Sequence, residues 1–158
     1  MTTTTVRTFR APKMEGFVPA HFNVDSERRL VTVRFDSEVT VQDVVQYLES
    51  LKANPAFDPG FSGLVDLTQV MSSEVDFQAA MMLSHEVDPF SRKARRAFVA
   101  PRAATFWTVR MYQKARGDDG SVAVFRTMDE AKHWLHIEQS ATGNSIQWLS
   151  KSYAASVA

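Results

Sequence analysis

Residues 124–135 read VFRTMDEAKHWL, and they contain the change of pattern that decides the fold. A short apolar run, which is typical of a strand, gives way to Thr127 and, three residues later, Glu130. This Thr-x-x-Glu spacing is a capping box, which marks the first turn of a helix. The stretch therefore predicts a strand over 121–126 that leads directly into a helix through about Glu138.

The same alternation of strand and helix runs back through the rest of the chain. Short apolar or alternating runs predict strands, and apolar residues at helical spacing predict helices. Expected strands cover residues 17–24, 29–35, 61–67 and 95–100, and expected helices begin at Val41, Glu74 and Pro101 and end near Asn54, Val87 and Arg116. With the last strand and helix, the order is β-β-α-β-α-β-α-β-α. This order predicts an α/β fold, a mixed sheet of about five strands covered by four helices.

Local signals indicate where several of these elements end. Thr40 is expected to cap the first helix, and Ser72 or Ser73 the second, after a polar turn over 68–73. Gly117 is expected to close the third helix, because glycine readily adopts the left-handed conformation found after helix ends. These residues therefore predict separate helices joined by short connections.

Length and composition indicate one domain. A chain of 158 residues with 44% hydrophobic residues can bury a single core. We expect a flexible N-terminal tail over 1–15, a single domain over 16–140, and a C-terminal tail over 141–158. Apolar residues such as Trp148 can dock this last tail on the body.

The charge balance and the absence of cysteine exclude several kinds of protein. The chain has 18 basic and 18 acidic residues without a long charged run, which argues against nucleic-acid binding. Without cysteine there are no disulfides, thiolate nucleophiles or cysteine metal ligands, and a reducing, cytoplasmic location is expected. No stretch approaches the roughly 18 apolar residues of a membrane-spanning helix. No motif assigns a catalytic residue, a metal site or a cofactor, so we expect none of these.

Two groups of residues imitate binding sites and are better interpreted as solvent-exposed surface. On the last helix, His133 and His136 lie away from the apolar face that contains Trp134. Residues 92–96, RKARR, form the basic cluster of the chain, without interleaved aromatic residues to stack on bases. We expect this cluster to be a solvated approach to the strand over 95–100, with binding of a phosphate or an acidic partner as the alternative.

The stretch 124–135, together with Leu64-Val65-Asp66-Leu67 before the second helix, resembles the SpoIIAA-like family. That family is related in fold to the anti-sigma-factor antagonist (STAS) and lipid-binding CRAL-TRIO domains. The resemblance covers about residues 16–137, and its most specific part is the last strand followed by a helix with Ala-x-x-Trp-Leu. It implies a STAS-like sheet and a role in binding or regulation.

In the STAS branch of this fold, a serine at the start of the second helix is a phosphorylation switch. The matching turn contains Asp66, Thr68, Ser72 and Ser73, but it lacks the Asp before the serine pair and the Gly after it. A helix N-terminus favours a phosphate group, whereas the carboxylate of Glu74 opposes one. The resemblance therefore implies a candidate phospho-switch turn, and simple helix capping by the serines is the alternative.

The second and third helices carry apolar residues on more than one side. Phe77 and Met81 lie roughly opposite the main apolar stripe of the second helix, and Phe106 and Val109 lie off that of the third. Either these helices pack on each other as well as on the sheet, or the surplus residues form a groove. The groove is predicted to consist of Phe77, Met81, His85, Phe106, Trp107 and Val109.

Three functions follow from these features. The first is a non-enzymatic binding module, whose groove takes a small apolar, lipid-like ligand or a second copy of the chain in a homodimer. The alternative is a partner-switching regulator of the anti-sigma-factor-antagonist type, with a phosphate on the turn over 68–73. The third is an enzyme in which Asp66 and either His85 or His21 act as acid and base.

Overall fold

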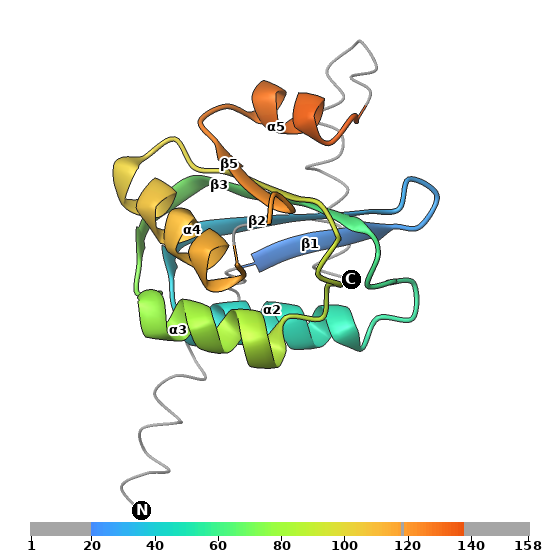
Figure 1. Cartoon of the computed structure of the whole chain (residues 1–158), viewed down its shortest axis with the longest axis horizontal. Coiled ribbons are helices and arrows are strands. Elements are labelled where there is room, and N and C mark those ends of the chain that lie inside the picture. Colours follow the sequence, from blue (N-terminus) through green and yellow to red (C-terminus); the bar gives the residue numbers. More distant parts are fainter. Residues whose placement is uncertain (1–19, 118, 138–158) are drawn as a thin grey trace, which may run out of the picture.

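The computed structural model describes residues 20–117 and 119–137, which contain a sheet with helices on both faces (Figure 1). The strands are β1 (Ala20–Asp25), β2 (Leu30–Val39), β3 (Ser62–Ser73), β4 (Arg96–Val99) and β5 (Val122–Phe125). They form a five-stranded sheet in the order β1-β2-β3-β4-β5, with β1 antiparallel to β2 and the remaining neighbours parallel. The mixed α/β sheet predicted from the order of elements is therefore confirmed.

The helices cover the two faces of the sheet unequally. They are α2 (Val41–Lys52), α3 (Phe77–Met82), which continues into the π-helical segment η1 (Leu83–Val87), α4 (Ala103–Ala115) and α5 (Met128–Trp134). One core lies between the sheet and α2, α3 and α4, and a smaller core lies between the opposite face and α5 (Figure 1). Since β2 to β5 follow one another across the sheet, right-handed crossovers place the three connecting helices on the same face.

β3 is longer than the sequence predicts, and the expected turn over 68–73 is a strand. It stays paired with β2 as far as Ser73, and the pairing contains two register shifts. Leu67 and Val70 are three residues apart yet both contact the larger core, which a strand of period two allows only with a bulge between them. The bulges interrupt the alternation of apolar and polar residues, and the interrupted pattern resembles that of a turn.

The second helix begins later than predicted. Its first residue is Phe77 in place of Glu74, and the side chain of Asp76 caps it by accepting a hydrogen bond from the Ala79 N–H at 2.8 Å. The prediction of a serine cap is wrong because both serines still belong to β3. The predicted end of this helix near Val87 is correct, since η1 ends at Val87 and Asp88 has extended backbone.

Three predicted caps are confirmed. The hydroxyl of Thr40 accepts from the Asp43 N–H and the Asp43 carboxylate accepts from the Thr40 N–H, both at 3.0 Å. Thr127 accepts from the Glu130 N–H at 3.2 Å, and Gly117 follows α4 with a φ of 107°. These local signals are reliable because each depends on residues within one turn of chain.

Replacing Thr40 with alanine is expected to lower the free energy of unfolding by about 1 kcal/mol, because it removes the hydroxyl half of the box that starts α2. Denaturant unfolding followed by circular dichroism measures this change. Ser50→Ala is the matched control, because Ser50 is an exposed hydroxyl on the same helix. Its expected effect is within about 0.5 kcal/mol. Equal effects of the two substitutions would contradict the role of the cap.

The last helix is shorter than predicted and ends at Trp134, two residues before His136 adopts a φ of 60°. The predicted N-terminal tail (1–15), the docking of residues 141–158 and the outer limits of the domain over 16–140 fall wholly or partly outside the described residues. Within the described residues, no helix has the length and apolar character that crossing a bilayer requires.

Candidate functional site

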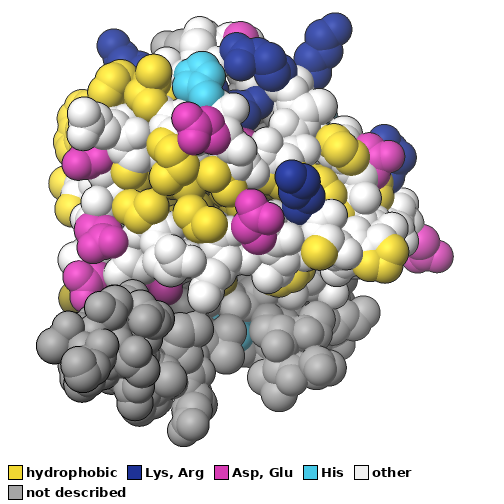
Figure 2. Space-filling view, turned by 90° about the horizontal axis from the view of Figure 1, so that it is seen from below, with side chains coloured by type: hydrophobic (Ala, Val, Ile, Leu, Met, Phe, Trp, Pro, Cys, Tyr) yellow, Lys and Arg dark blue, Asp and Glu magenta, His cyan; other side chains and the backbone are white. Residues whose placement is uncertain are grey.

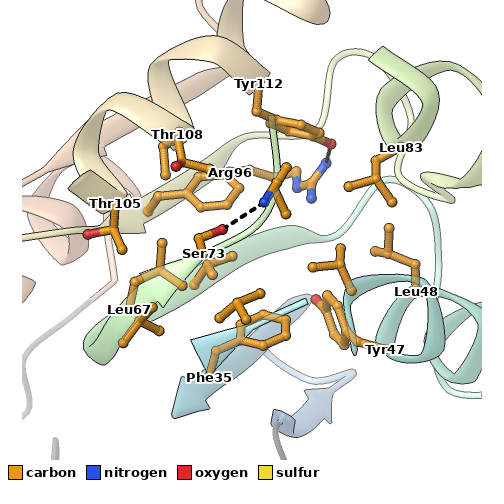
Figure 3. Close-up of a pocket in the computed structure, with 17 residues that line it drawn as sticks. Phe35, Tyr47, Leu48, Leu67, Ser73, Leu83, Arg96, Thr105, Thr108 and Tyr112 are labelled. Carbon is orange, nitrogen blue, oxygen red and sulfur yellow. Dashed lines mark hydrogen bonds between the residues drawn. The ribbon is translucent and has the colours of Figure 1, made fainter. Parts of the chain in front are cut away.

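A cavity of about 90 Å³, partly open to the surface, lies between the sheet and helices α2 and α4 (Figure 3). Its floor is apolar and comes from β2, β3 and β4, with Phe35, Val65 and Phe98 among the residues that line it. Polar side chains are few on this surface, and the most polar end contains Arg96 and Tyr112. Such a site, largely apolar with a few convergent polar groups, is the usual form of a small-molecule pocket.

The helical walls of the cavity follow from residue spacing. Each helix presents one stripe of residues spaced by three and four positions, which places them on one face. The stripes are Val44, Tyr47 and Leu48 on α2, and Thr105, Thr108, Val109 and Tyr112 on α4. The bulged end of β3 closes the region between them with Leu67 and Val70.

A buried ionic cluster forms the polar end of the cavity. The side chain of Asp88 is 1% exposed, and its Oδ2 accepts hydrogen bonds from Arg96 Nη1 at 2.5 Å and from Arg116 Nη1 at 2.8 Å. The hydroxyl of Tyr112 donates to the same oxygen and accepts from Arg96 Nη1 at 3.0 Å. Two guanidinium groups therefore share one carboxylate inside the protein.

The segment η1 places Asp88 in this cluster. The Asp88 N–H donates to the carbonyl of Leu83, five residues earlier, which is the widened turn of a π-helix. The other carboxylate oxygen of Asp88 accepts from the Phe90 N–H at 3.0 Å. Both oxygens are thus held, and the carboxylate is fixed toward the sheet.

The electrostatics of the cluster follow from burial and from the two cations. Burial by itself raises the pKa of Asp88, but the positive charge of Arg96 and the hydrogen bond from Tyr112 outweigh it and hold that pKa below its usual value. Burial raises the pKa of Tyr112 and of Tyr47, so both remain protonated donors. At neutral pH the cluster contains one carboxylate, two guanidinium groups and two neutral phenols.

Arg96 corrects the prediction that residues 92–96 are a solvated cluster. Arg92, Lys93 and Arg95 are exposed, but Arg96 is 3% exposed and points from β4 toward the larger core. Its guanidinium stacks on the ring of Phe90, 4.2 Å from the ring centroid. Alternation along a strand explains the difference, because neighbouring residues point to opposite faces.

Gly63 makes room for this arrangement. A Cβ at this position would lie 3.3 Å from Arg96 Cγ, which is closer than an ordinary contact, and 3.4 Å from Phe90 Cζ. Gly63 lies beside Arg96 in the pairing of β3 with β4. The arginine can therefore lie across the sheet with its guanidinium against Phe90.

The six predicted groove residues divide between the cavity and the surface of the described part of the protein. Val109 is buried and lines the cavity, whereas Phe77, Met81 and Trp107 are 48%, 38% and 63% exposed. His85 is also exposed, and Phe106 stacks edge-to-face on Trp107. α3 and α4 contact each other, as the first of the two interpretations predicted. The cavity lies between the sheet, α2 and α4, and self-association through the exposed apolar residues of α3 and α4 stays a prediction.

Hydrophobic side chains gather on the face of the molecule seen from the side of α2 and α3 (Figure 2). Acidic and basic side chains and a histidine surround them. From the described residues alone, Phe77 and Met81 are the large apolar side chains of α3 that stay exposed.

The residues of the predicted phospho-switch turn lie along β3. Asp66 is buried and accepts from the Thr68 N–H at 2.8 Å, Ser72 is exposed, and Ser73 is half-buried and accepts from the Val75 N–H at 3.2 Å. Neither serine lies in the first turn of α3, so a phosphate there would lack the N–H groups of the helix end. Phosphorylation of Ser72 stays a prediction, and it no longer has this physical support.

The acid–base pairs predicted for an enzyme are not brought together. Asp66 lies between Val65 and Leu67, which face the larger core, so its side chain points to the opposite face of the sheet. His85 is exposed on η1, on the side of the larger core. His21 shares the face of Asp66 but is separated from it by β2, a distance of about 9–10 Å between the strands. Its imidazole instead lies 3.3 Å from Asp36.

The polar end of the cavity was missed by sequence reasoning because it is built from distant segments. Asp88 follows η1, Arg96 begins β4 and Arg116 follows α4, and only the tertiary structure shows that they share a buried site. One sequence signal was available, since Arg96 occupies the inward position of a strand together with Phe98. The stripe of cavity residues on α4 was also present in the sequence, but two of its residues are threonines, so it does not look like an apolar face.

The fold and the cavity together describe one class of protein, an α/β sheet protein with a small apolar internal site. No protein-family model matches the chain, and no curated protein matches it in sequence. Among solved structures, an uncharacterised DUF3478-family protein with a SpoIIAA-like fold from Shewanella loihica PV-4 is similar. It has 19% identity and a TM-score of 0.48, over 73% of this chain and 93% of that chain.

The anti-sigma factor antagonist SpoIIAA in its unphosphorylated form is also similar, with 11% identity and a TM-score of 0.45. The match covers 74% of this chain and 97% of that chain. The first is described as having a SpoIIAA-like fold and the second is SpoIIAA itself, which is the fold that the sequence analysis names. At these identities the likeness concerns the fold alone, and the function has to be argued from the cavity.

Proposed function

We propose that this protein is a non-enzymatic binding module, which takes a small apolar ligand into the cavity between the sheet, α2 and α4. The observation that supports this is the cavity itself, because its lining combines a largely apolar floor with a fixed polar end. Protein interiors are close-packed, and voids larger than a water molecule are few. A space of about 90 Å³ between the principal helices therefore favours a binding role.

The energy of an empty cavity gives the scale of this argument. Residual cavities in protein cores cost about 24 cal/mol per Å³, so 90 Å³ corresponds to about 2 kcal/mol. A ligand that fills the space recovers contacts that the lining residues otherwise lack. Each buried methylene of the ligand adds about 0.8 kcal/mol. An apolar body of a few carbon atoms is thus sufficient for measurable binding.

A neutral probe tests the proposal without assuming any charge on the ligand. We expect 1-pentanol to produce saturable NMR shifts at the backbone amides of cavity residues such as Leu48, Val65 and Val109. Shifts that grow linearly without saturation, or that cluster on the exposed residues of α3, would contradict the proposal.

Filling the cavity is expected to abolish this binding. In Val109→Phe the larger side chain can enter the free space, so the free energy of unfolding should change by no more than about 1 kcal/mol. Pentanol should then no longer give saturable shifts. Val122→Phe is the matched control, because Val122 is buried in the same core but does not line the cavity. It should cost about 1–3 kcal/mol by overpacking and leave pentanol binding intact.

Binding that survives the filling of the cavity would mean that the ligand binds outside it. If Val109→Phe binds pentanol with an unchanged Kd, the site is not this cavity. If both variants lose binding together with their native spectra, the loss reflects unfolding. A smaller filling change, Val109→Ile, then tests the cavity, because an unchanged Kd in this folded variant would count against it.

A further inference from the structure

The polar end of the cavity has more positive than negative charge. Asp88 is the carboxylate that bonds to Arg96 and Arg116 within the described residues, so one carboxylate serves two cations. Arg116 also lies near the exposed Asp119, whose pKa its charge helps to lower. Arg96 has no comparable second carboxylate among its described hydrogen-bond partners. The unmatched charge therefore lies on the side of the cluster that lines the cavity.

One edge of the Arg96 guanidinium is unbonded. Its hydrogen bonds within the described residues all leave from Nη1, to Asp88 and to Tyr112. Its Nε is buried and has no hydrogen-bond partner among the described residues. A buried donor without a partner is uncommon in native structures and indicates a missing acceptor. The free edge, formed by Nε and Nη2, has the fork geometry that a carboxylate can accept in a bidentate manner.

A second free donor lies at the same end of the cavity. Tyr47 is 5% exposed, lines the cavity from α2, and makes no hydrogen bond within the described part of the chain. Figure 3 shows its hydroxyl directed toward the cavity, at the end where the Arg96 guanidinium lies. Two side chains with free donors, Arg96 on β4 and Tyr47 on α2, thus line the same cavity, and these donors have no acceptor among the described residues.

We propose that the ligand of this cavity is a short-chain aliphatic carboxylate, whose carboxylate accepts hydrogen bonds from Arg96 and Tyr47 while its alkyl chain occupies the apolar part. The inference rests on the proposed binding function and specifies the class of ligand. A monocarboxylate matches the single unmatched charge. A phosphate dianion would exceed that charge and would lie near the carboxylate of Asp88.

The test compares three ligands of the same length in the wild-type protein: pentanoate, pentanamide and 1-pentanol, at constant ionic strength. We expect pentanoate to bind with a Kd lower by about tenfold or more than either neutral ligand, because hydrogen bonds to charged groups are stronger than those between neutral groups. Acetate has the same charge without the chain and should bind weakly. Isothermal titration calorimetry or NMR titration gives the four Kd values.

Removing the hydroxyl of Tyr47 tests whether this residue binds the carboxylate of the ligand. Tyr47→Phe keeps the ring and should raise the Kd of pentanoate by about three- to tenfold, with little change for an alkane-like probe such as xenon. Ser50→Ala is the control, because Ser50 is an exposed hydroxyl on the same helix and does not line the cavity. It should leave the Kd of pentanoate unchanged.

The outcomes separate this inference from the function on which it rests. If pentanol binds in the cavity and pentanoate binds no more tightly, the protein is an apolar binding module and the carboxylate inference is wrong. If neither ligand binds, the proposed function fails. If pentanoate is preferred but Tyr47→Phe and Ser50→Ala affect it equally, the carboxylate is not held by Tyr47, and its proposed position is overturned.

Discussion

Replacing Asp88 with asparagine is expected to lower the free energy of unfolding by about 3–5 kcal/mol. Asparagine has nearly the same shape but no charge, so Arg96 and Arg116 would remain side by side without a counterion. Both arginine side chains are 4% exposed, which means that water cannot replace the lost carboxylate. Chemical denaturation of the purified variant measures the loss, and a melting temperature lower by many degrees should accompany it.

The control for this substitution is Asp25→Asn. Asp25 forms an ion pair of 3.9 Å with Arg28 near the β1–β2 turn, and the side chains of Arg28 and Asp25 are 57% and 36% exposed. Exposed pairs contribute about 0–1 kcal/mol, so this variant should be nearly as stable as the wild type. If Asp88→Asn costs no more than Asp25→Asn, the buried cluster is not the electrostatic anchor described above.

Acidification provides a second measurement of the same interaction. The pKa of Asp88 is lower in the folded protein than in the unfolded chain, so its carboxylate contributes stability that is fully present above about pH 4, the ordinary carboxyl value. That contribution is lost as the pH falls through the lower, folded value. The wild type should therefore lose more stability below pH 4 than Asp88→Asn does. Parallel curves for the two proteins would contradict this.

The fold was predictable from sequence because its signals are local. The caps at Thr40 and Thr127 and the stop at Asp88 depend on a few neighbouring residues, and these set most element boundaries. Errors arose where pairing between strands overrode the local pattern. The segment over 68–73 has a turn-like composition, yet β2 continues beside it and holds it in the sheet. A sequence pattern does not show how long the partner strand is.

The site was less predictable from sequence because several of its buried residues are polar. The hydrophobic pattern that predicts burial does not select them. Counting hydrophobic residues on α4 selected Trp107 for the groove, although it is 63% exposed, and overlooked the stripe with Thr105 and Tyr112, which are buried. Threonine and tyrosine bury well when their hydroxyls find partners, and here Thr105 donates to the carbonyl of Arg102. A buried arginine within a basic run is equally hard to recognise from sequence. The buried guanidinium of Arg96 needs the carboxylate of Asp88, which comes from another segment.

Replacing Leu48 with alanine is expected to lower the free energy of unfolding by about 2–5 kcal/mol and, in addition, to change which ligands the protein prefers. Leu48 is 2% exposed and lines the cavity, so its truncation removes a large apolar side chain and enlarges the space. Because each buried methylene is worth about 0.8 kcal/mol, longer chains gain from the added volume. The chain length bound most tightly in a series of 1-alkanols should increase by about two carbon atoms.

Leu51→Ala separates the loss of stability from the change in ligand preference. Leu51 lies about one turn further along α2 and is fully buried in the same core, but it does not line the cavity. Its truncation should cost a similar free energy of unfolding and leave the preferred alkanol length unchanged. Titrations must be made well below the lowered melting temperature of both variants, so that each is folded. A shift of equal size in both variants would mean that the ligand senses general loosening of α2. An unchanged preference in Leu48→Ala, with the expected loss of stability, would mean that alkanols bind outside the cavity.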